Sequence, residues 1–288
     1  MGRRGVRAWA RRAGEGAPDR ALGLSIIWGT ILTTRWEGRR QVLEDGWHRC
    51  VSLTEEGAAV ASHYVVRSVE RAGPEIIAAL GEAGVATVHE AAGRVGLLGP
   101  AIRPRQAGAV VAGSAITVSC HPGDNLMIHA AVEVCAPGDI LVVTTTSPST
   151  DGMFGELLAT SLMARGVAGL ISDAGVRDIA ALREMGFPVW SRAVHAQGTV
   201  KASPGSVNVP VVAAGQLVGP GDIIVADDDG VVALPIALGA PVAEAAAKRT
   251  AAEADKRAQL ASGTLGVDMY NLRPLLAELG VEYVDRLP

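Results

Sequence analysis

Short apolar runs alternate with turn residues along most of the chain, and stretches with helical spacing lie between them. Apolar runs bounded by Gly, Pro or Asp predict buried strands, whereas apolar residues three or four positions apart predict helices. Strands are expected at residues 110–118, with a bulge at Gly113, and at 169–172, 207–213, 223–226, 231–234 and 281–284. Helices are expected at residues 74–83, 125–133, 180–185, 242–262 and 272–279. Alternating strands and helices indicate an α/β fold.

Two near-copies occur along the chain, APGDILVV at residues 136–143 and GPGDIIVA at residues 219–226. In each copy a Pro-Gly turn leads into an apolar run, which predicts a tight turn followed by a buried strand. Two copies are too few for a solenoid. The pattern therefore indicates repeated turn chemistry within one domain.

The helix expected at residues 242–262 is rich in alanine and in charged residues. Alanine buries little apolar surface, so this helix gains little by packing on its own domain. A helix of this kind often packs against another subunit, which suggests an oligomer.

Residues 1–61 differ from the rest of the chain, because four of the five Trp and three Arg-Arg pairs fall there. An apolar stretch at residues 21–34 follows the basic start, as in a secretory signal peptide, but no A-x-A cleavage site follows it. A cleaved export signal is therefore the less favoured reading. The favoured one is an extension, poorly ordered or produced by a start site placed too early, before a single domain at residues 62–288.

Charge and cysteine usage exclude several classes of protein. Residues 1–50 carry ten Arg and five acidic residues, whereas the remainder carries 16 basic and 25 acidic residues. An acidic body argues against nucleic acid as a partner. Three cysteines without a CxxC pair fit a reducing cytoplasm and no zinc knuckle. No apolar run reaches the length of a membrane span.

The stretch from residue 154 to 178 holds the candidate site. Gly155 is followed by a helical pattern, whose first free N–H groups form a place for an anion. The strand at residues 169–172 then leads into a loop that ends in Arg177 and Asp178. Arg177 suits a carboxylate substrate, and Asp178 suits a hard divalent cation. The alternative is a surface ion pair on a loop.

Three other groups of residues can each be interpreted as functional or as purely structural. His129 lies on the helix of residues 125–133 and is, by itself, more typical of a half-buried structural histidine. The acidic run 227–230 could bind a cation but fits a turn between strands better. The loop 198–206 could reach an anion through Lys201, or be purely structural. GxSxG, HExxH and P-loop motifs are missing from the sequence, and the few lysines disfavour a Schiff base. Metal-assisted polarisation is the better enzyme mechanism.

Six segments together resemble the class II pyruvate aldolases that cleave 4-hydroxy-4-methyl-2-oxoglutarate and 4-carboxy-4-hydroxy-2-oxoadipate. The segments are VHEAAGRVGLL (88–98), GDNLMIHAAVE (123–133), GELLATSLMARGVAGLISDAGVRD (155–178), GFPVWSRAVHAQGTVKASPGSVNVPV (186–211), PGDIIVADDDGVVALP (220–235) and LGVDMYNLRPLLAELGVEYV (265–284). These aldolases share a fold with the regulators of ribonuclease E activity. The resemblance covers residues 62–288 and implies a three-layer β/β/α domain of the swivelling type with a C-terminal helical extension, forming homotrimers or homohexamers.

The resemblance also implies roles for individual residues. Asp178 would hold Mg²⁺ or Mn²⁺, with Glu253 of a neighbouring subunit in the outer shell. Gly155 and the N–H groups of Leu157 and Leu158 would bind the pyruvyl carboxylate. Arg177 would face the ketone oxygen, and Glu156 and His129 would orient water. Many relatives carry Asp where this chain has Glu156.

The implied activity is retro-aldol cleavage of 4-hydroxy-2-oxo acids to pyruvate, with oxaloacetate decarboxylase activity beside it, in the catabolism of aromatic acids. The alternative is a non-catalytic regulator that binds an RNA-degrading enzyme. The Arg177-Asp178 pair and the aldolase-like C-terminal end favour the enzyme.

Overall fold

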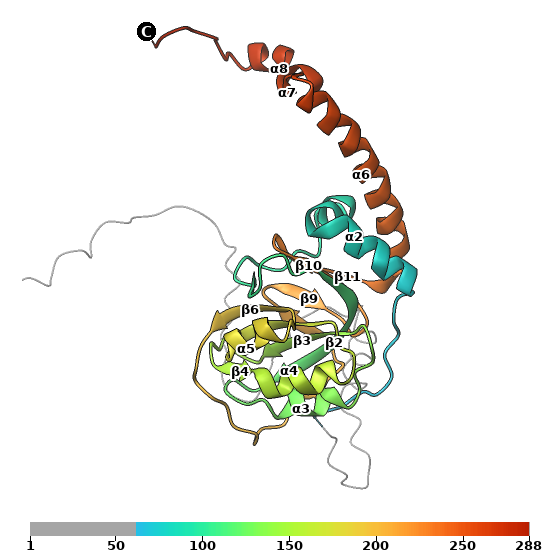
Figure 1. The fold of residues 1–288 in the computed structure, drawn as a ribbon, viewed down its shortest axis with the longest axis vertical. Coiled ribbons are helices and arrows are strands. Elements are labelled where there is room, and N and C mark those ends of the chain that lie inside the picture. The colour runs from blue at the N-terminus through green and yellow to red at the C-terminus, as the bar shows by residue number, and fades with distance from the viewer. Residues whose placement is uncertain (1–61, 288) are drawn as a thin grey trace, which may run out of the picture. The chain divides into compact units, whose positions relative to one another are not determined.

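A nine-stranded sheet forms the centre of the fold in the computed structural model, which describes residues 62–287 (Figure 1). Its strand order is β1-β6-β5-β3-β2-β10-β11, with β4 paired to β5 and β7 paired to β2. The proposed extension 1–61 lies outside the described residues. The strands are β1 (Arg103–Pro104), β2 (Val111–Cys120), β3 (Ile140–Thr145), β4 (Gly152–Phe154), β5 (Gly169–Val176), β6 (Val189–Val194), β7 (Ser206–Val207), β10 (Ile223–Asp227) and β11 (Gly230–Leu234).

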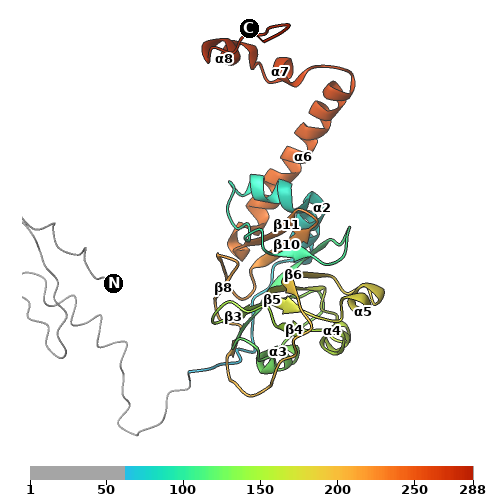
Figure 2. The ribbon, with the colours of Figure 1, turned by 90° about the vertical axis from the view of Figure 1, so that its left-hand side faces the viewer.

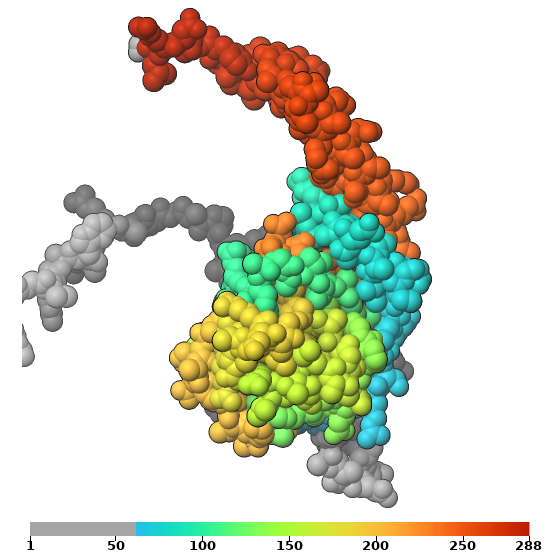
Figure 3. Space-filling model, viewed as in Figure 1, coloured from blue at the N-terminus to red at the C-terminus, as the bar shows by residue number. Residues whose placement is uncertain are grey.

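Three helices cover one face of the sheet because of how its parallel strands are connected. β2, β3, β5 and β6 are adjacent and parallel, and crossovers of the same hand place their helices on one side. The helices are α3 (Leu126–Val132), α4 (Glu156–Met163) and α5 (Ile179–Glu184). The part of the chain that contains α4 and α5, coloured yellow-green to gold, forms much of the lower surface seen in Figure 3.

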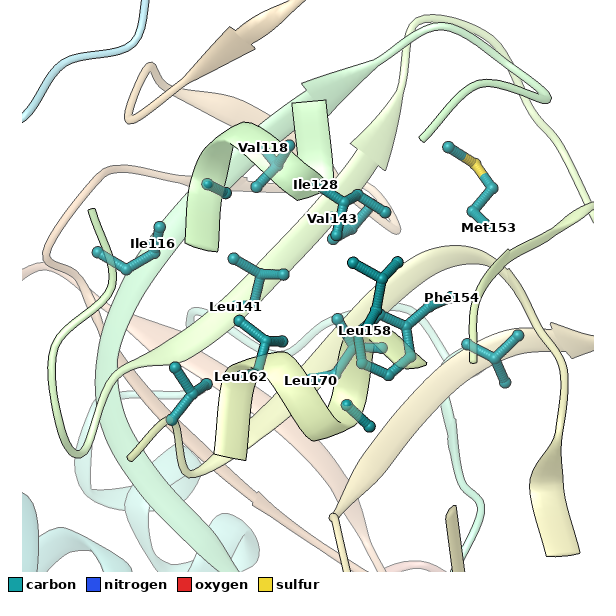
Figure 4. Close-up of a cluster of buried hydrophobic side chains, with 14 of the residues drawn as sticks. Ile116, Val118, Ile128, Leu141, Val143, Met153, Phe154, Leu158, Leu162 and Leu170 are labelled. Carbon is teal, nitrogen blue, oxygen red and sulfur yellow. The ribbon is translucent and has the colours of Figure 1, made fainter. Parts of the chain in front are cut away.

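The main hydrophobic core lies between these helices and the sheet (Figure 4). Its aliphatic residues alternate along β2 and β3, so that Ile116, Val118, Leu141 and Val143 point to the same face. Phe154 and Phe187 stack with their ring centroids 5.8 Å apart. Each fully buried aliphatic or aromatic side chain contributes about 1.5–3 kcal/mol to folding. This core fixes β4 and α4, which bound the candidate site.

A two-stranded sheet of β8 (Val211–Ala213) and β9 (Gln216–Val218) covers the opposite face. A second core of buried residues joins this hairpin to the main sheet, with Trp190 fully buried in it. The indole N–H of Trp190 donates to Asp227 O at 2.8 Å, which satisfies its polar atom. The three layers confirm the expected β/β/α class.

Two further helices pack on each other and on β10. Helix α2 (Pro74–Ala91) is kinked at Gly84, which has φ 76° and ψ 165°, in agreement with the helix end expected there. The first part of α6 (Gly239–Ala261) packs on α2 and buries Val242 and Ala246. Figure 2 shows this pair beside β10 and β11.

A C-terminal helical extension follows, as expected. It comprises the rest of α6, α7 (Gly266–Met269) and α8 (Arg273–Glu278). The expected strand at residues 281–284 is wrong, because these residues form no ladder. No helix among residues 62–287 is both long and apolar enough to cross a bilayer.

Two other expectations need correction. Gly113 forms no bulge, because β2 pairs with β10 in unbroken register through it. A Cβ at Gly113 would overlap Gly138 O, so the glycine permits a close approach of the turn before β3. The expected strand 207–213 is split into β7 and β8, since Asn208 adopts a left-handed backbone with φ 58°.

The two Pro-Gly-Asp copies do form the same turn, each before a buried strand. In the first copy, Asp139 Oδ2 accepts the Ala136 N–H at 2.7 Å, and in the second, Asp222 Oδ2 accepts the Gly219 N–H at 2.7 Å. Each aspartate thus bonds to the residue three positions earlier. Asp139 is buried and is also paired with Arg71 at 2.7 Å.

Candidate functional site

Polar residues gather at the edge of the sheet where four parallel strands end. β2, β3, β5 and β6 run in one direction, so the segments that follow them emerge together. Ligands of open α/β sheets bind outside the carboxyl ends of the strands. The segments at this edge carry Asp124, Asn125, Asp151, Arg177, Asp178, His195 and Lys201.

Strand pairing places Arg177 and Asp178 beside Gly155. β4 and β5 are parallel, with Phe154 opposite Val176. The Arg177 N–H donates to Phe154 O at 2.8 Å. The residues that follow the two strands are therefore neighbours, although more than twenty positions separate them in the sequence. β5 extends to Val176, four residues beyond the expected strand, and this length brings the pair to the turn at Gly155.

The Asp178 carboxylate lies at the N-terminus of α4. Its Oδ2 accepts the Glu156 N–H at 3.2 Å and lies 3.6 Å from Arg177 Nε. Asp178 has φ 56°, a left-handed backbone that costs about 1–3 kcal/mol outside glycine and is concentrated at functional sites. The positive end of a helix dipole favours a negative charge here.

Gly155 leaves the space that this carboxylate occupies. A Cβ at Gly155 would overlap Asp178 Oδ2 and would lie 3.1 Å from Arg177 Cγ. The N–H groups of Leu157 and Leu158 belong to the first turn of α4, where a helix has no intrahelical acceptor for them. The arrangement therefore joins amide donors, a guanidinium and a carboxylate in one place, which favours a site over an incidental surface ion pair.

The donor set fits a hydrated divalent cation. Within residues 62–287 there is no group of three or more His, Cys, Asp or Glu that could enclose a metal. Mg²⁺ keeps several waters and is bound through one or two carboxylates plus substrate oxygens. The Asp178 side chain is 42% exposed, so it can offer such a ligand. An anionic ligand at the same helix end would be repelled by Asp178, and a cation held by Asp178 would offset that repulsion.

A loop covers this edge of the sheet. From the sequence it could be either anion-binding or structural. We call residues 195–205, between β6 and β7, the 195–205 loop; in Figure 1 it is the gold-coloured segment that leaves β6. Gly152 N–H donates to Gln197 O at 2.8 Å, and Val200 N–H donates to Gly123 O at 3.0 Å. A Cβ at Gly198 would lie 3.3 Å from Arg177 Nη1, so the loop passes close to the guanidinium.

Asp124 anchors the same loop and was not singled out from the sequence. Its buried carboxylate accepts the N–H groups of Leu126, Ala202 and Ser203 at 2.9, 2.7 and 2.7 Å. Burial disfavours the charged form, but these hydrogen bonds outweigh it and lower the pKa of Asp124. The signal available in the sequence was the Gly-Asp-Asn turn at residues 123–125, whose distant partners the sequence does not reveal.

The two residues expected to orient water lie on the helices beside this edge. Glu156 is exposed at the first position of α4. His129 is exposed on α3, where partial burial, followed by the Lys201 charge, lowers the pKa of the imidazole. A lowered pKa keeps the imidazole neutral at neutral pH, so it can accept a proton. Among the described residues, the imidazole of His129 has no hydrogen-bond partner.

Glu253 lies on α6, in an ion-pair cluster with α2. Arg249 Nε lies 2.8 Å from Glu253 Oε1, and Arg249 Nη1 lies 3.9 Å from Glu90 Oε2. Among residues 62–287, no hydrogen bond or ion pair joins Glu253 to Asp178. Its expected entry into a neighbouring subunit's site stays a prediction.

The acidic run at residues 227–230 is the turn between β10 and β11, as favoured. Asp227 Oδ2 accepts the Val85 N–H at 2.8 Å, and Asp228 accepts the Gly108 N–H at 3.0 Å. These carboxylates are therefore used to hold α2 and the segment before β2. Cys120 and Cys135 are buried, and burial raises the pKa of each thiol to about 12, which makes both poor nucleophiles.

A three-layer α/β domain with its candidate site at the carboxyl ends of parallel strands is the class that fold and site define. Comparison with known proteins makes this specific. The model of the RraA-like family, described as Aldolase/RraA, matches residues 78–233. The chain belongs to this family, which confirms the resemblance seen in the sequence.

Relatives and solved structures agree with this placement. A Halalkalibacterium halodurans protein named "Putative 4-hydroxy-4-methyl-2-oxoglutarate aldolase" is 30% identical over 59% of this chain and 80% of its own length. A Burkholderia multivorans protein of the same name is 37% identical over 49% of this chain and 85% of its own length. Streptomyces coelicolor RraAS2, described as an unusual member of the RNase ES inhibitor RraA protein family, matches with a TM-score of 0.60 at 29% identity. That match covers 66% of this chain and 99% of RraAS2.

Replacing Gly155 by alanine tests the geometry of the site. Gly155 has φ −162° and ψ −166°, an extended backbone that alanine adopts readily. The added methyl meets the flexible end of Asp178, so the free energy of unfolding should change by less than about 1 kcal/mol. With pyruvate and Mg²⁺ as probes of the candidate site, the displaced carboxylate should weaken binding roughly tenfold or more, measured by calorimetry. Gly266→Ala is the control, since no heavy atom lies within 4 Å of its Cβ position. Unchanged binding by Gly155→Ala would contradict this geometry.

Asp124 should make stability depend on pH. Its pKa is lower in the folded chain than in the unfolded one, so its stabilisation is present above the unfolded value of about 3.9 and is lost as the pH falls through the folded value. Denaturant unfolding of Asp124→Asn and the parent should differ by about 2 kcal/mol at pH 7 and converge in acid. The exposed Asp255→Asn variant on α6 is the control. A gap that stays constant down to pH 2 would show that the charge of Asp124 is not what anchors the loop.

Proposed function

We propose that this chain is a divalent-metal-dependent pyruvate aldolase that cleaves 4-hydroxy-2-oxo acids. The substrates would be 4-carboxy-4-hydroxy-2-oxoadipate, giving pyruvate and oxaloacetate, and 4-hydroxy-4-methyl-2-oxoglutarate, giving two pyruvates. The observation that carries the proposal is the Arg177-Asp178 pair against Gly155 at the N-terminus of α4. The names of the relatives support the same reaction class.

The bond that breaks joins C3 and C4 of the substrate. Removal of the proton from the 4-hydroxyl lets C4 become a carbonyl, and the C3–C4 electron pair becomes the enolate of pyruvate. The free N–H groups of Leu157 and Leu158 suit the C1 carboxylate. The Arg177 guanidinium suits the C2 oxygen, where negative charge develops, and a donor placed there contributes about 3–4 kcal/mol.

Asp178 would hold the cation, Mg²⁺ or Mn²⁺, which when bound supplies Lewis-acid polarisation of the 2-oxo group. The remaining proton transfers fall to water held by Glu156 and His129. Glu156 is one residue from Gly155, and the neutral imidazole of His129 can accept a proton. The leaving enolate must finally gain a proton at C3, which the same water can return.

The same enolate arises when oxaloacetate loses CO₂, so oxaloacetate decarboxylase activity should accompany the aldol cleavage. Substrates of this kind are products of aromatic ring cleavage, and the proposed setting is cytoplasmic catabolism of aromatic acids. Small-molecule oxo acids, and not nucleic acid or membranes, would be the partners.

A non-catalytic role is the second candidate. The match to RraAS2, described as a member of an RNase inhibitor family, favours a regulator that binds an RNA-degrading enzyme. Such a role does not require the left-handed backbone of Asp178 or the space left by Gly155. An assay of turnover separates the two functions.

Oligomer formation is part of the proposal, as a homotrimer or homohexamer. α7 and α8 have four and six residues, which is too short for stable isolated helices. Their surroundings expose large apolar side chains, including Leu272, Leu275, Leu279, Tyr283 and Val284 at 38–71%. The Arg177 and Asp178 side chains are also 47% and 42% exposed. A second copy that covers both surfaces would bury apolar area and exclude water from the site.

Removing the metal or its ligand tests the reaction. Asp178→Ala should abolish metal-dependent release of pyruvate from 4-carboxy-4-hydroxy-2-oxoadipate while leaving thermal unfolding nearly unchanged. Arg177→Lys should lower kcat roughly 100-fold with a smaller rise in KM, because a point charge replaces a planar fork. Coupled pyruvate assays with and without chelator measure both effects. Full activity in excess chelator would rule out the metal-dependent mechanism.

Mixed oligomers test the shared site. Chains with Asp178→Ala and chains with Glu253→Ala should each be inactive alone. Co-expression should restore part of the activity, because one subunit boundary then pairs an intact Asp178 with an intact Glu253 from the adjacent chain. If verified mixed oligomers stay inactive, Glu253 acts within its own subunit, where it pairs with Arg249.

A further inference from the structure

Asn125 connects the two segments that border Arg177. Its backbone N–H donates to Val200 O in the 195–205 loop at 3.0 Å. Its side-chain Nδ2 donates to Met153 O in β4 at 3.0 Å. Asn125 is 8% exposed, so both bonds form away from water. One residue therefore ties the loop to the strand that leads into Gly155.

The orientation of the Asn125 amide follows from this pattern. Only Nδ2 can donate to the Met153 carbonyl. Oδ1 then has no protein partner among the described residues. A buried amide acceptor without a partner is uncommon and raises the cost of keeping Asn at this position. The contribution of this side chain is therefore the hydrogen bond that Nδ2 donates to Met153 O, because its Oδ1 gains no partner.

The two bordering segments meet again at Arg177. On one side, β4 continues to Gly155, whose Cβ position lies 3.1 Å from Arg177 Cγ. On the other side, Gly198 of the loop has its Cβ position 3.3 Å from Arg177 Nη1. The separation between β4 and the loop therefore sets the width of the space in which the guanidinium lies. The Gly152 N–H also joins β4 to the loop, by a direct bond to Gln197 O.

We infer that Asn125 is a positioning residue for Arg177. By joining Val200 to Met153, it holds the 195–205 loop and β4 at a fixed separation and so keeps the guanidinium aimed at the C2 oxygen of the substrate. This role rests on the proposed function for its chemistry, but the coupling of loop and strand is a property of the chain itself. Asp124 anchors the far end of the loop, whereas the side chain of Asn125 bonds to β4.

The test compares two asparagines with the same bonding pattern. Asn208 is also buried, donates Nδ2 to Val66 O at 2.7 Å and leaves Oδ1 without a protein partner among the described residues. It holds the segment before α2, and among the described residues its hydrogen bonds go to Val66 and Thr117, not to β4 or Arg177. Asn125→Asp and Asn208→Asp each replace one donor by an acceptor of equal shape and should lower the thermal unfolding midpoint similarly.

Hydrogen exchange of the full chain gives the first readout. Asn125→Asp should speed amide exchange at residues 152–154 and 197–201 at least tenfold, whereas Asn208→Asp should leave both segments unchanged. If Asn125→Asp does not fold, Asn125→Ser is smaller, carries no charge and loses the same bond. Unchanged exchange in both segments, or equal acceleration by Asn208→Asp, would overturn the inference.

Kinetics of pyruvate release give the second readout. Asn125→Asp should lower kcat at least tenfold with less than a threefold change in KM, since Arg177 is misaimed in the transition state but the carboxylate site at α4 is intact. Asn208→Asp should keep the parental kcat. An equal loss of kcat in the two variants would show that Asn125 acts through general stability alone. A parent chain without turnover would contradict the proposed function, and the exchange comparison would then decide whether Asn125 couples the loop to β4.

Discussion

Close packing of backbone at the carboxyl edge of the sheet is the constraint on which the rest of the structure depends. Here glycines let backbone segments at the ends of β2, β3, β5 and β6 approach one another closely. A Cβ at Gly175 would overlap Thr150 O, and one at Gly152 would overlap His195 O. This contact lets β4 pair with β5, and the pairing puts Gly155 beside Asp178. The hydrophobic core beneath β4 and α4 supplies the burial that holds the backbones together.

The charged groups at this edge include the Asp178 carboxylate, the Arg177 guanidinium and the positive end of the α4 dipole. Asp178 lies at the positive end of α4 and next to Arg177, so one negative charge is well accommodated. A second negative charge, from an oxo acid, also suits the helix end and the guanidinium but is repelled by Asp178. In the proposed function, a divalent cation held by Asp178 would offset this repulsion. The proposed chemistry would suit this arrangement of charges.

The features of the scaffold can be told apart from those of the candidate site. The scaffold of three layers needs its cores, its Pro-Gly-Asp turns and its anchored loop for folding, whatever the chain does. The site adds only a few features to that scaffold, namely the left-handed Asp178, the open space at Gly155 and the amide donors of α4.

Local patterns in the sequence determined the class of fold and the core of the candidate site. Apolar runs, Pro-Gly turns and helix-ending glycines depend on near neighbours, so they predicted β10, α3, α5, α6 and the turn at residues 227–230. The Arg177-Asp178 pair and the α4 N-terminus were likewise visible, because each is a contiguous motif. The short β4, the extension of β5 to Val176 and the true role of Gly113 were not, because each depends on a strand or turn far away in the sequence.

Only the tertiary structure decided which segments surround that motif. The 195–205 loop reaches the site through Asp124 and Asn125, which lie more than seventy residues earlier, and a bond between backbone atoms leaves no trace in residue type. For the same reason the sequence could not distinguish an anion-binding loop from a structural one. The sequence gives the chemistry of each side chain directly, whereas the distance between backbone segments depends on how the whole sheet packs.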